Sequence, residues 1–491
     1  MVRVKKLLTT LLPPYHMIQL RKYQADAIEN LRKAFADGHR AVILCAPTGA
    51  GKTIMFSAIA QSALQKGKRV MILTDRGELL WQAGGALNNL AIVPELITAE
   101  TTRVNSSQRI FVAMIETIYR RCEQRIYSEL LNSVDLFIFD ECHKRTFDKI
   151  VARLPENAMI LGATATPVRD TTGKALKDIY TNIVEAASIT HLVDEGYLAN
   201  PHYYSVAVDL KNVGTKGGDF DMDSLARHYQ TTELYKGVVD NYKKHANGTK
   251  ALLFAPNLAS ADEVLQEIQK AGYQAKSLDA SASREERRNT LKWYKETPGS
   301  FLVNVGLFTT GFDEPTVETV ILYRATKSLA LYLQMIGRGS RTTENKKDFR
   351  VLDFGNNLAR FGVWDADREW SLDEKVKKKT PGVPPMKHCP QCESMNHISA
   401  KDCAWCGLPF EKSDDEKIRE YVMLEKWEAR RKAVNSDAKD WALLTKAKKV
   451  SAFWVLHKCC KTMKDAEDYR DAMGYKKGWL YYHKDRTGHL R

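Results

Sequence analysis

A Gly-rich segment near the N-terminus, APTGAGKT at residues 46–53, combines a flexible backbone with a lysine and a hydroxyl group. Gly49 and Gly51 permit a tight turn whose backbone N–H groups can face a phosphate, because no bulky side chain blocks the approach. We expect Lys52 to reach the β and γ phosphates of a nucleotide and the Thr53 hydroxyl to hold Mg²⁺. The expected cradle consists of Thr48, Gly49, Ala50, Gly51, Lys52 and Thr53. A Gly turn without a ligand is the alternative.

Two adjacent carboxylates follow an apolar run further along the chain. Residues 136–139 (LFIF) are typical of a buried strand, and Asp140 and Glu141 come directly after them. Because the carboxyl ends of parallel strands meet at one edge of a sheet, we expect both side chains close to the phosphate cradle. We predict that Asp140 binds Mg²⁺ and that Glu141 orients and deprotonates the attacking water. A solvated acidic turn is the alternative.

Four motifs occur in the same order as in superfamily 2 helicases. They are APTGAGKT at 46–53, DECH at 140–143, TAT at 164–166 and QMIGRGSR at 334–341. The chain resembles this superfamily, which implies an ATPase that acts on nucleic acid. DECH in place of DEAD, and Gln334 in place of His, favour a DNA motor over a local strand-separating RNA helicase. Over about residues 18–360 the chain looks most like the bacterial RadD-type DNA-repair helicases or a phage-encoded relative.

The resemblance implies roles for residues on both sides of the nucleotide. Arg338 and Arg341 are similar to the arginines that reach across a cleft and stabilise charge on the γ-phosphate. Together with Gln334 they make up the expected catalytic residues of the second lobe. Arg21 and Gln24 resemble the segment that reads adenine, and a helix start with a polar face is the alternative there.

Contacts with nucleic acid are expected at strand ends in both lobes. Arg76 and Thr117 are the candidates in the first lobe, and Thr310 is the candidate in the second. Gly311 and Asp313 belong to the segment that, by resemblance, couples nucleic acid to the ATP site. Each of these side chains could instead be an ordinary loop residue.

Apolar runs of strand length alternate with amphipathic stretches over the first 185 residues, and a second series starts near residue 250. The sequence therefore predicts an α/β protein with two tandem RecA-like lobes of parallel sheet. The expected domains are lobe 1 (1–185), a connector with lobe 2 (186–365), a linker (366–386), a zinc ribbon (387–411) and a basic, mostly helical region (412–491). Within the second domain, residues 191–204 and 213–219 are interpreted as connector and surface loop.

Two CxxC pairs lie ten residues apart in the small Cys-rich module. Paired thiolates in two such turns suit a closed tetrahedral Zn²⁺ site of structural type. The expected ligands are Cys389, Cys392, Cys403 and Cys406. His388 and His397 are close enough to be alternative ligands, and a redox pair or free thiols would be the reading without metal.

The chain has 491 residues and a formal net charge of +14, from 74 Lys and Arg against 60 Asp and Glu. Such an excess favours a polyanionic partner. In the C-terminal region Trp479 is a candidate platform for base stacking, although a helical core with lysines at its rim fits residues 453–456 equally well. No stretch approaches the length of a membrane-spanning helix, and we expect no membrane partner and a cytoplasmic location.

These expectations combine into an ATP- and Mg²⁺-dependent DNA helicase or branched-DNA remodelling motor in repair, recombination or replication. Single-stranded, forked or branched DNA is the favoured partner. A duplex translocase of the restriction-motor type shares the same motifs. An adaptor, in which the zinc ribbon and tail bind a protein partner while ATP switches its conformation, is the third hypothesis.

Overall fold

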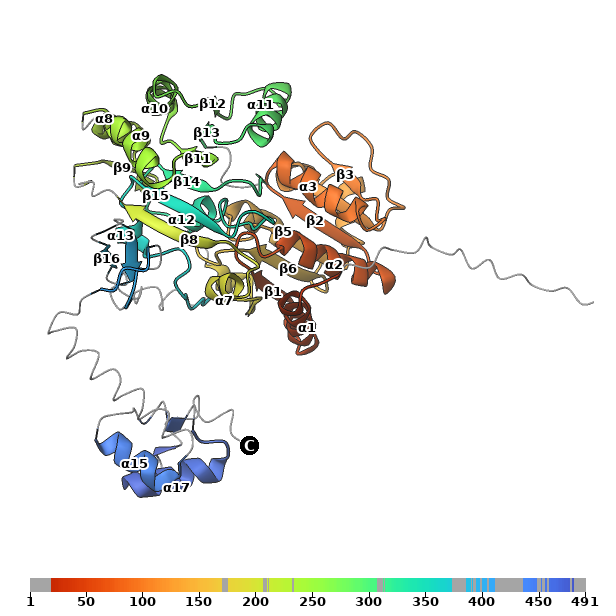
Figure 1. Cartoon of the computed structure of the whole chain (residues 1–491). Helices are drawn as coiled ribbons and strands as arrows, with labels where there is room; N and C mark the ends of the chain where they lie inside the picture. Colours follow the sequence, from red (N-terminus) through yellow and green to blue (C-terminus); the bar gives the residue numbers. More distant parts are fainter. Residues whose placement is uncertain are drawn as a thin grey trace, which may run out of the picture. The chain divides into compact units, whose positions relative to one another are not determined.

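The computed structural model forms two compact units, Met1–Leu408 and Pro409–Arg491, which are described separately (Figure 1). The structure describes residues 19–169, 175–205, 210, 212–231, 234–306, 312, 314–372, 386–389, 391, 394–397, 400–403, 406–410, 436–447, 452, 455–456, 459–476 and 479–480. The first unit contains both lobes and the Cys-rich module.

Lobe 1 is built on a parallel sheet of seven strands within the described residues, in the order β3-β4-β2-β5-β6-β1-β7. The strands are β1 (Ala41–Cys45), β2 (Val70–Thr74), β3 (Glu95–Ile97), β4 (Ile110–Met114), β5 (Leu136–Asp140), β6 (Met159–Thr164) and β7 (Asn182–Glu185). The central strands are buried along their whole length because helices cover both faces, which explains their continuous apolar sequences.

The helices of lobe 1 are α1 (Lys22–Ala36), α2 (Lys52–Gln65), α3 (Gly77–Asn88), α4 (Ile115–Arg121), α5 (Arg125–Asn132) and α6 (Asp148–Val151), with short 3₁₀ turns at Arg145–Phe147 and Leu176–Asp178. Side chains of β1 alternate between the two faces. Val42 and Leu44 join the core under α1, α2 and α3, whereas Ile43 joins the core under α4 and α5. All parallel strands therefore end at one edge, where the motif residues lie.

Lobe 2 contains a sheet of eight strands in the described part of the chain, in the order β12-β13-β11-β14-β15-β8-β17-β16. Its strands are β8 (Asn200–Ser205), β11 (Ala251–Phe254), β12 (Ala275–Leu278), β13 (Phe301–Asn304), β14 (Thr319–Leu322), β15 (Asp348–Asp353), β16 (Met386–His388) and β17 (Met395–His397). The first six are parallel, and β17 pairs antiparallel with β8 through Met395 and Tyr203. The Cys-rich module thus extends this sheet.

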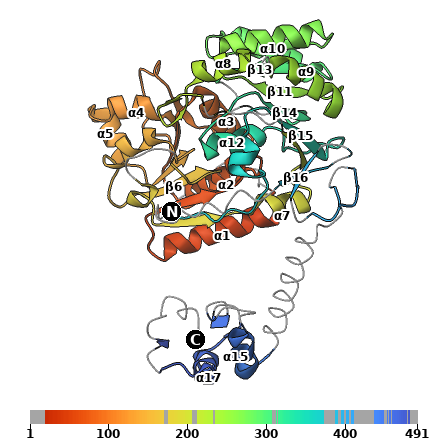
Figure 2. The ribbon, with the colours of Figure 1, turned by 90° about the vertical axis from the view of Figure 1, so that its left-hand side faces the viewer.

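The helices that follow the connector are α8 (Met222–Thr231), α9 (Leu234–His245), α10 (Leu258–Lys270), α11 (Arg284–Glu296), α12 (Leu329–Ile336) and α13 (Asn357–Phe361). Figure 2 shows α8, α9 and α10 lying together, and their side chains share one core with β11. Helix α12 belongs instead to a core that is continuous with that of lobe 1. The arginine motif consequently starts at the boundary between the lobes.

The connector contains more regular structure than its sequence indicates. Residues 191–204, which were interpreted as a connector, include part of α7 (Ile189–Asp194) and most of β8. The polar strand β8 is stabilised by its long-range pairing with β15, which no local pattern reveals. Residues 213–219, interpreted as a surface loop, form most of a short hairpin of β9 (Thr215–Lys216) and β10 (Asp219–Phe220).

Residues 362–372, which follow the second lobe, pack against both lobes. Trp364 is buried, its indole N–H donates to the carbonyl of Leu333 at 3.1 Å, and its backbone N–H donates to Tyr203 Oη at 3.1 Å. Leu372 packs against the core of lobe 1. The part of the expected linker that lies at 366–372 is therefore in contact with the lobes, and residues 373–385 lie outside the described residues.

The C-terminal unit has helices α15 (Ala438–Lys446) and α17 (Met463–Met473) around a small apolar cluster. Val455 and Leu456 are fully buried in it, which agrees with the interpretation of this segment as helical core. Trp479 is partly buried, and its ring lies 4.5 Å from that of Tyr475.

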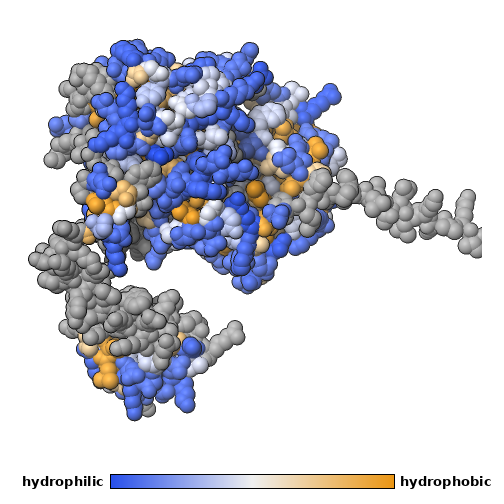
Figure 3. All heavy atoms as spheres, viewed as in Figure 1, coloured by the Kyte–Doolittle hydropathy of each residue, from blue (hydrophilic) through white to orange (hydrophobic). Residues whose placement is uncertain are grey.

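The visible surface of the two-lobe unit is mostly hydrophilic, with separate apolar patches (Figure 3). Among the described residues, no helix has the length and apolar character needed to cross a membrane.

Candidate nucleotide-binding and catalytic site

The Gly-rich segment forms a turn between β1 and α2. Gly49 and Gly51 have φ angles of +88° and +80°, a conformation that glycine adopts without steric cost. Helix α2 begins directly after Gly51, so Lys52 and Thr53 lie in its first turn. A helix N-terminus with a glycine turn in front of it presents unpaired N–H groups to an anion.

The segment expected to read adenine forms hydrogen bonds to this turn. The Gln24 amide nitrogen donates to the Ala50 carbonyl at 3.1 Å, and Tyr23 Oη donates to the same oxygen at 2.8 Å. The Gln24 amide oxygen accepts the Arg21 backbone N–H at 3.0 Å, which begins α1. The guanidinium of Arg21 lies 4.5 Å from the centre of the Tyr197 ring. Gln24 thus links the first helix to the phosphate loop.

The two carboxylates lie at the end of β5, opposite the loop. Glu141 Oε1 is 3.8 Å from Lys52 Nζ, and both side chains are largely buried. Glu141 has a φ angle of +57°, which is rare for a residue with a side chain and is typically found at functional sites. Asp140, the last residue of the strand, is buried beside it.

The pKa values of the two carboxylates shift in opposite directions because their surrounding charges differ. Burial, together with the negative charge of Glu141, raises the pKa of Asp140 above its usual range. Burial would also raise the pKa of Glu141, but the positive charges of Lys52, His143, Lys144 and Arg338 outweigh it and lower this pKa. Glu141 is therefore ionised at neutral pH, as a proton acceptor must be.

A histidine that sequence reasoning left without a role connects two motifs. His143 Nδ1 lies 3.4 Å from Glu141 Oε2 and 2.8 Å from Thr164 Oγ1. Thr164 Oγ1 also accepts the Thr166 backbone N–H at 3.0 Å. The DECH and TAT segments thus form one polar network. Both segments were visible in the sequence, but their contact depends on the pairing of β5 with β6.

Side chains of lobe 2 also contact Glu141 and the phosphate loop. The Gln334 amide nitrogen, from α12, donates to Glu141 Oε2 at 3.4 Å. Ser340 Oγ lies 3.5 Å from the Thr48 carbonyl oxygen, so the arginine motif contacts the phosphate loop itself. Gly337 lies so close that a Cβ atom there would be 2.6 Å from Thr48 Cβ. The two lobes meet at the phosphate loop.

The two motif arginines lie at this boundary. Arg338 is 6% exposed, and its Nη1 donates to the Phe312 carbonyl at 2.6 Å. Arg341 forms an isolated bridge with Leu198, and a Cβ atom at Gly49 would lie 3.9 Å from Arg341 Cγ. Arg341 is thus close to the cradle, and the positive charge of Arg338 acts on Glu141, whose pKa it helps to lower.

The expected nucleic-acid contacts are only partly described. Arg76 precedes the first turn of α3 at the end of β2, and Thr117 is buried in α4. Thr310, Gly311 and Asp313 lie outside the described residues.

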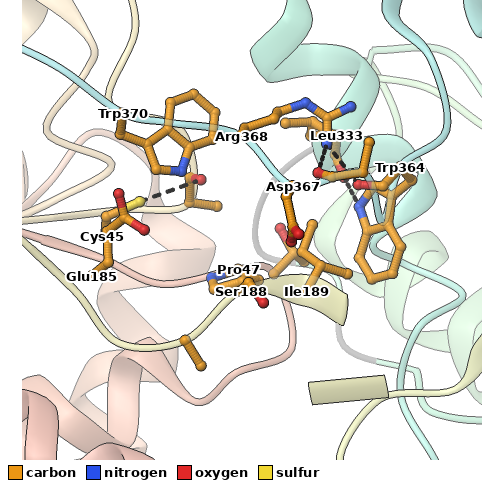
Figure 4. A pocket seen from close by; sticks show the side chains of 14 residues that line it. Cys45, Pro47, Glu185, Ser188, Ile189, Leu333, Trp364, Asp367, Arg368 and Trp370 are labelled. Carbon is orange, nitrogen blue, oxygen red and sulfur yellow. Dashed lines mark hydrogen bonds between the residues drawn. The ribbon is translucent and has the colours of Figure 1, made fainter. Parts of the chain in front are cut away.

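A cavity of about 320 Å³ lies beside the phosphate loop (Figure 4). Cys45, Pro47 and Glu185 line it from lobe 1, and Leu333 lines it from α12. Figure 4 shows the segment from Trp364 to Trp370 crossing the cavity, with Trp364 beside Leu333 and Trp370 beside Cys45 and Glu185. This segment and α12 therefore both lie next to the phosphate loop.

Three of the four cysteines come together in the Cys-rich module. The sulfur atoms of Cys389, Cys403 and Cys406 lie within 4.8 Å of one another, and the Cys389 and Cys406 sulfurs are 3.6 Å apart. Asn396 Nδ2 lies 3.6 Å from Cys403 Sγ. Cys392 lies outside the described residues. The described thiols could hold a metal ion.

Comparison with known proteins agrees with this geometry. Residues 17–169 match the family of the type III restriction enzyme, res subunit, and residues 232–343 match the helicase conserved C-terminal domain. The chain is 31% identical over 390 residues to the 51.5 kDa protein of Lactococcus phage (isolate 7-9), covering 77% of this chain and 80% of that protein. The chain belongs to helicase superfamily 2. Its two lobes are those of a nucleic-acid-dependent ATPase.

This helicase is also 28% identical over 359 residues to the putative ATP-dependent helicase IRC3 of Saccharomyces cerevisiae, covering 68% of this chain and 51% of the yeast protein. The chain thus spans about half the length of that relative. A fragment of a putative HsdR subunit of a type I restriction enzyme from Vibrio vulnificus YJ016 has the same fold, with a TM-score of 0.55 at 23% identity. That match covers 74% of this chain and 69% of the fragment.

The close approach of Gly337 to Thr48 gives a direct test of how the lobes meet. Replacing Gly337 by Ala would force the lobes apart, because the new Cβ would lie 2.6 Å from Thr48 Cβ. We expect ATP turnover with nucleic acid to fall by about 100-fold, as for a misplacement of about 1 Å, while binding of a fluorescent ATP analogue persists. Gly85→Ala, in α3, is the control, since a Cβ there meets nothing within 4 Å. Unchanged turnover by Gly337→Ala would contradict the close approach.

Proposed function

We propose that this helicase hydrolyses ATP between its two lobes and uses the resulting opening and closing to move along DNA. The observation that carries the proposal is the position of Glu141, which contacts Lys52 from its own lobe and Gln334 from the other. Hydrolysis at such a site depends on closure, and closure changes the surface that both lobes offer to a strand.

The residues of the pocket divide the chemistry among them. Glycine N–H groups and Lys52 hold the phosphates, and Glu141, ionised by its cationic neighbours, accepts the proton of the attacking water. Gln334 fixes the carboxylate of Glu141. Arg338 and Arg341 contribute positive charge from lobe 2 as negative charge develops on the γ-phosphate.

The Thr53 hydroxyl and the Asp140 carboxylate would hold Mg²⁺. Both are hard oxygen ligands, and the buried pair of carboxylates at the end of β5 is a place where a cation offsets like-charge repulsion. The chemistry that Mg²⁺ would supply at these residues is positive charge beside the phosphates of the nucleotide.

DNA is the proposed partner because the matched family is that of a restriction subunit, and because the motif variants resemble those of DNA-repair motors. A role in repair or recombination, as in the RadD-type family, is the specific form of this proposal. Arg76, Thr117 and Thr310 are proposed to contact the strand, with Trp479 as an additional stacking platform in the C-terminal unit.

Two alternatives give different results in simple assays. A restriction-type translocase would displace a triplex-forming strand without separating a duplex, whereas a helicase would separate a forked duplex. An adaptor would lose its protein partner but keep ATP turnover when Pro409–Arg491 is removed. This deletion starts at Pro409 because β16 and β17 complete the sheet of lobe 2.

We also propose that Cys392 joins Cys389, Cys403 and Cys406 in a structural Zn²⁺ site. Four thiolates suit tetrahedral Zn²⁺, and the three described sulfur atoms lie within 4.8 Å of one another. The ion would hold the two Cys turns together at the end of the β16–β17 pair.

Replacing Glu141 by Gln keeps the size of the side chain but removes the proton acceptor. We expect nucleic-acid-stimulated ATP turnover to fall by about 10²- to 10⁴-fold, and Lys52→Ala to weaken ATP binding as well. Turnover is measured against single-stranded, forked and duplex DNA and against RNA. Glu129→Gln, at an exposed site on α5, is the control. Normal turnover by Glu141→Gln would refute the assigned base, and stimulation by RNA alone would refute the DNA partner.

The zinc content of the purified protein tests the proposed metal site. We expect about one Zn²⁺ per purified chain, measured by elemental analysis, and loss of most of it in Cys403→Ser. Cys122→Ser, in lobe 1 and outside the cluster, should retain the metal. A full zinc content in Cys403→Ser, or no metal in the unchanged chain, would contradict the site.

A further inference from the structure

A buried lysine lies behind the arginine motif. Lys346 is 5% exposed, and its Nζ donates to three backbone carbonyl oxygens: Gly339 at 2.6 Å, Arg341 at 2.8 Å and Pro315 at 3.0 Å. An ammonium group has three N–H donors, so these bonds use all of them. Lysine is rarely buried unless its charge is compensated, and here all three donors are directed at backbone carbonyls.

The three carbonyls belong to two segments that serve the ATP site. Gly339 and Arg341 are in the arginine motif, which follows α12. Pro315 follows the segment at residues 309–313 that was expected, by resemblance, to couple nucleic acid to ATP. Arg338 Nη1 also donates to the carbonyl of Phe312, which is part of that segment. The bonds of Lys346 and the bond of Arg338 thus both connect the arginine motif to this part of the chain.

The surroundings of Lys346 leave it little freedom. Its backbone and that of Thr343 exchange two hydrogen bonds, of 3.1 and 3.3 Å, which close a tight turn. The ring of Phe349 lies under the ammonium at 6.0 Å. A Cβ atom at Gly339 would lie 2.4 Å from Phe349 Cδ2, so the backbone of the motif rests directly on this ring. Lys346 and Phe349 together define where that backbone can lie.

We propose that Lys346 is a positioning residue for ATP hydrolysis, which holds the backbone of the arginine motif so that Arg338 and Arg341 face the nucleotide across the cleft. This inference rests on the proposed function of the two arginines. In this role Lys346 holds the backbone of the motif through hydrogen bonds and does not itself touch the substrate. By bonding to Pro315 as well, Lys346 also makes the arginines sensitive to movement of the nucleic-acid segment.

Burial works against the charged form of Lys346. Burial lowers the pKa of Lys346 to about 7, while Glu318 and Glu314 favour its charged form and Arg341 opposes it. A buried ammonium is expensive, and it is a poor choice for stability alone. Its three N–H donors, which no apolar side chain supplies, fix three carbonyls at once.

Replacing Lys346 by Met keeps an unbranched side chain of nearly the same length and removes the donors. We expect kcat for DNA-stimulated ATP hydrolysis to fall at least about tenfold, because a displaced guanidinium no longer meets the transition state. KM and the binding of a fluorescent ATP analogue should stay close to those of the unchanged chain, since the cradle is in lobe 1. Lys347→Met, at the exposed neighbouring position, is the control and should leave kcat unchanged. A normal kcat in Lys346→Met would overturn the proposal.

A double-mutant cycle separates positioning from a general loss of stability. If Lys346 acts through the motif, Lys346→Met should lower kcat by a smaller factor in the Arg341→Ala background than in the unchanged chain, since only Arg338 is left to be positioned. If the two substitutions together lower kcat by the product of their separate effects, Lys346 acts independently of the arginine motif. All assays are run below the lowest unfolding temperature of the set. If Lys346→Met does not fold, Lys346→Gln, which keeps two N–H donors, takes its place in the same cycle.

The outcome also distinguishes this inference from the proposed function. Absence of nucleic-acid-stimulated turnover in the unchanged chain would remove the proposed function. Normal stimulation in the unchanged chain together with a normal kcat in Lys346→Met would remove only the positioning role.

Discussion

One carboxylate is shared between the two lobes, and the site depends on that contact. Glu141 lies within 3.8 Å of Lys52 in its own lobe and accepts a hydrogen bond from Gln334 in the other. In an enclosed pocket such interactions are stronger than in water, so small changes in lobe spacing alter the charge and orientation of this side chain. The positive φ angle of Glu141 shows that the backbone is held in an unusual conformation to place it there.

The rest of the two-lobe unit holds the two lobes at the distance that this contact requires. Parallel strands bring the phosphate loop, the carboxylates and the TAT segment to one edge of the first sheet. Helix α12 packs into a core that is continuous with that of lobe 1, and residues 362–372 return from the second lobe to the first. Behind the arginine motif, Lys346 fixes the backbone from which Arg338 and Arg341 extend.

Local sequence predicted the parts of this site that are continuous in the chain. The strands β1 and β5 can be recognised from their own sequences, because a strand buried on both faces is apolar along its whole length. The residues that follow them can be recognised in the same way, because a tight turn requires glycine at that point of the sequence. Strand β8 and the extension of the second sheet by β17 were not predicted, because both depend on pairing between distant segments. The sequence shows Lys346 only as one lysine of an exposed-looking run, TTENKK, and gives no sign of its burial.

In the proposed mechanism, lobe 2 supplies part of the catalytic charge. The most direct test of this contribution is ATP hydrolysis by Arg338→Ala, measured in single turnovers with DNA present and beside the binding of an ATP analogue. We expect hydrolysis to slow by about 10³-fold or more while binding is retained, as for an arginine that acts on the transition state. Hydrolysis at the unchanged rate would show that lobe 1 performs the reaction alone, and would contradict the shared site.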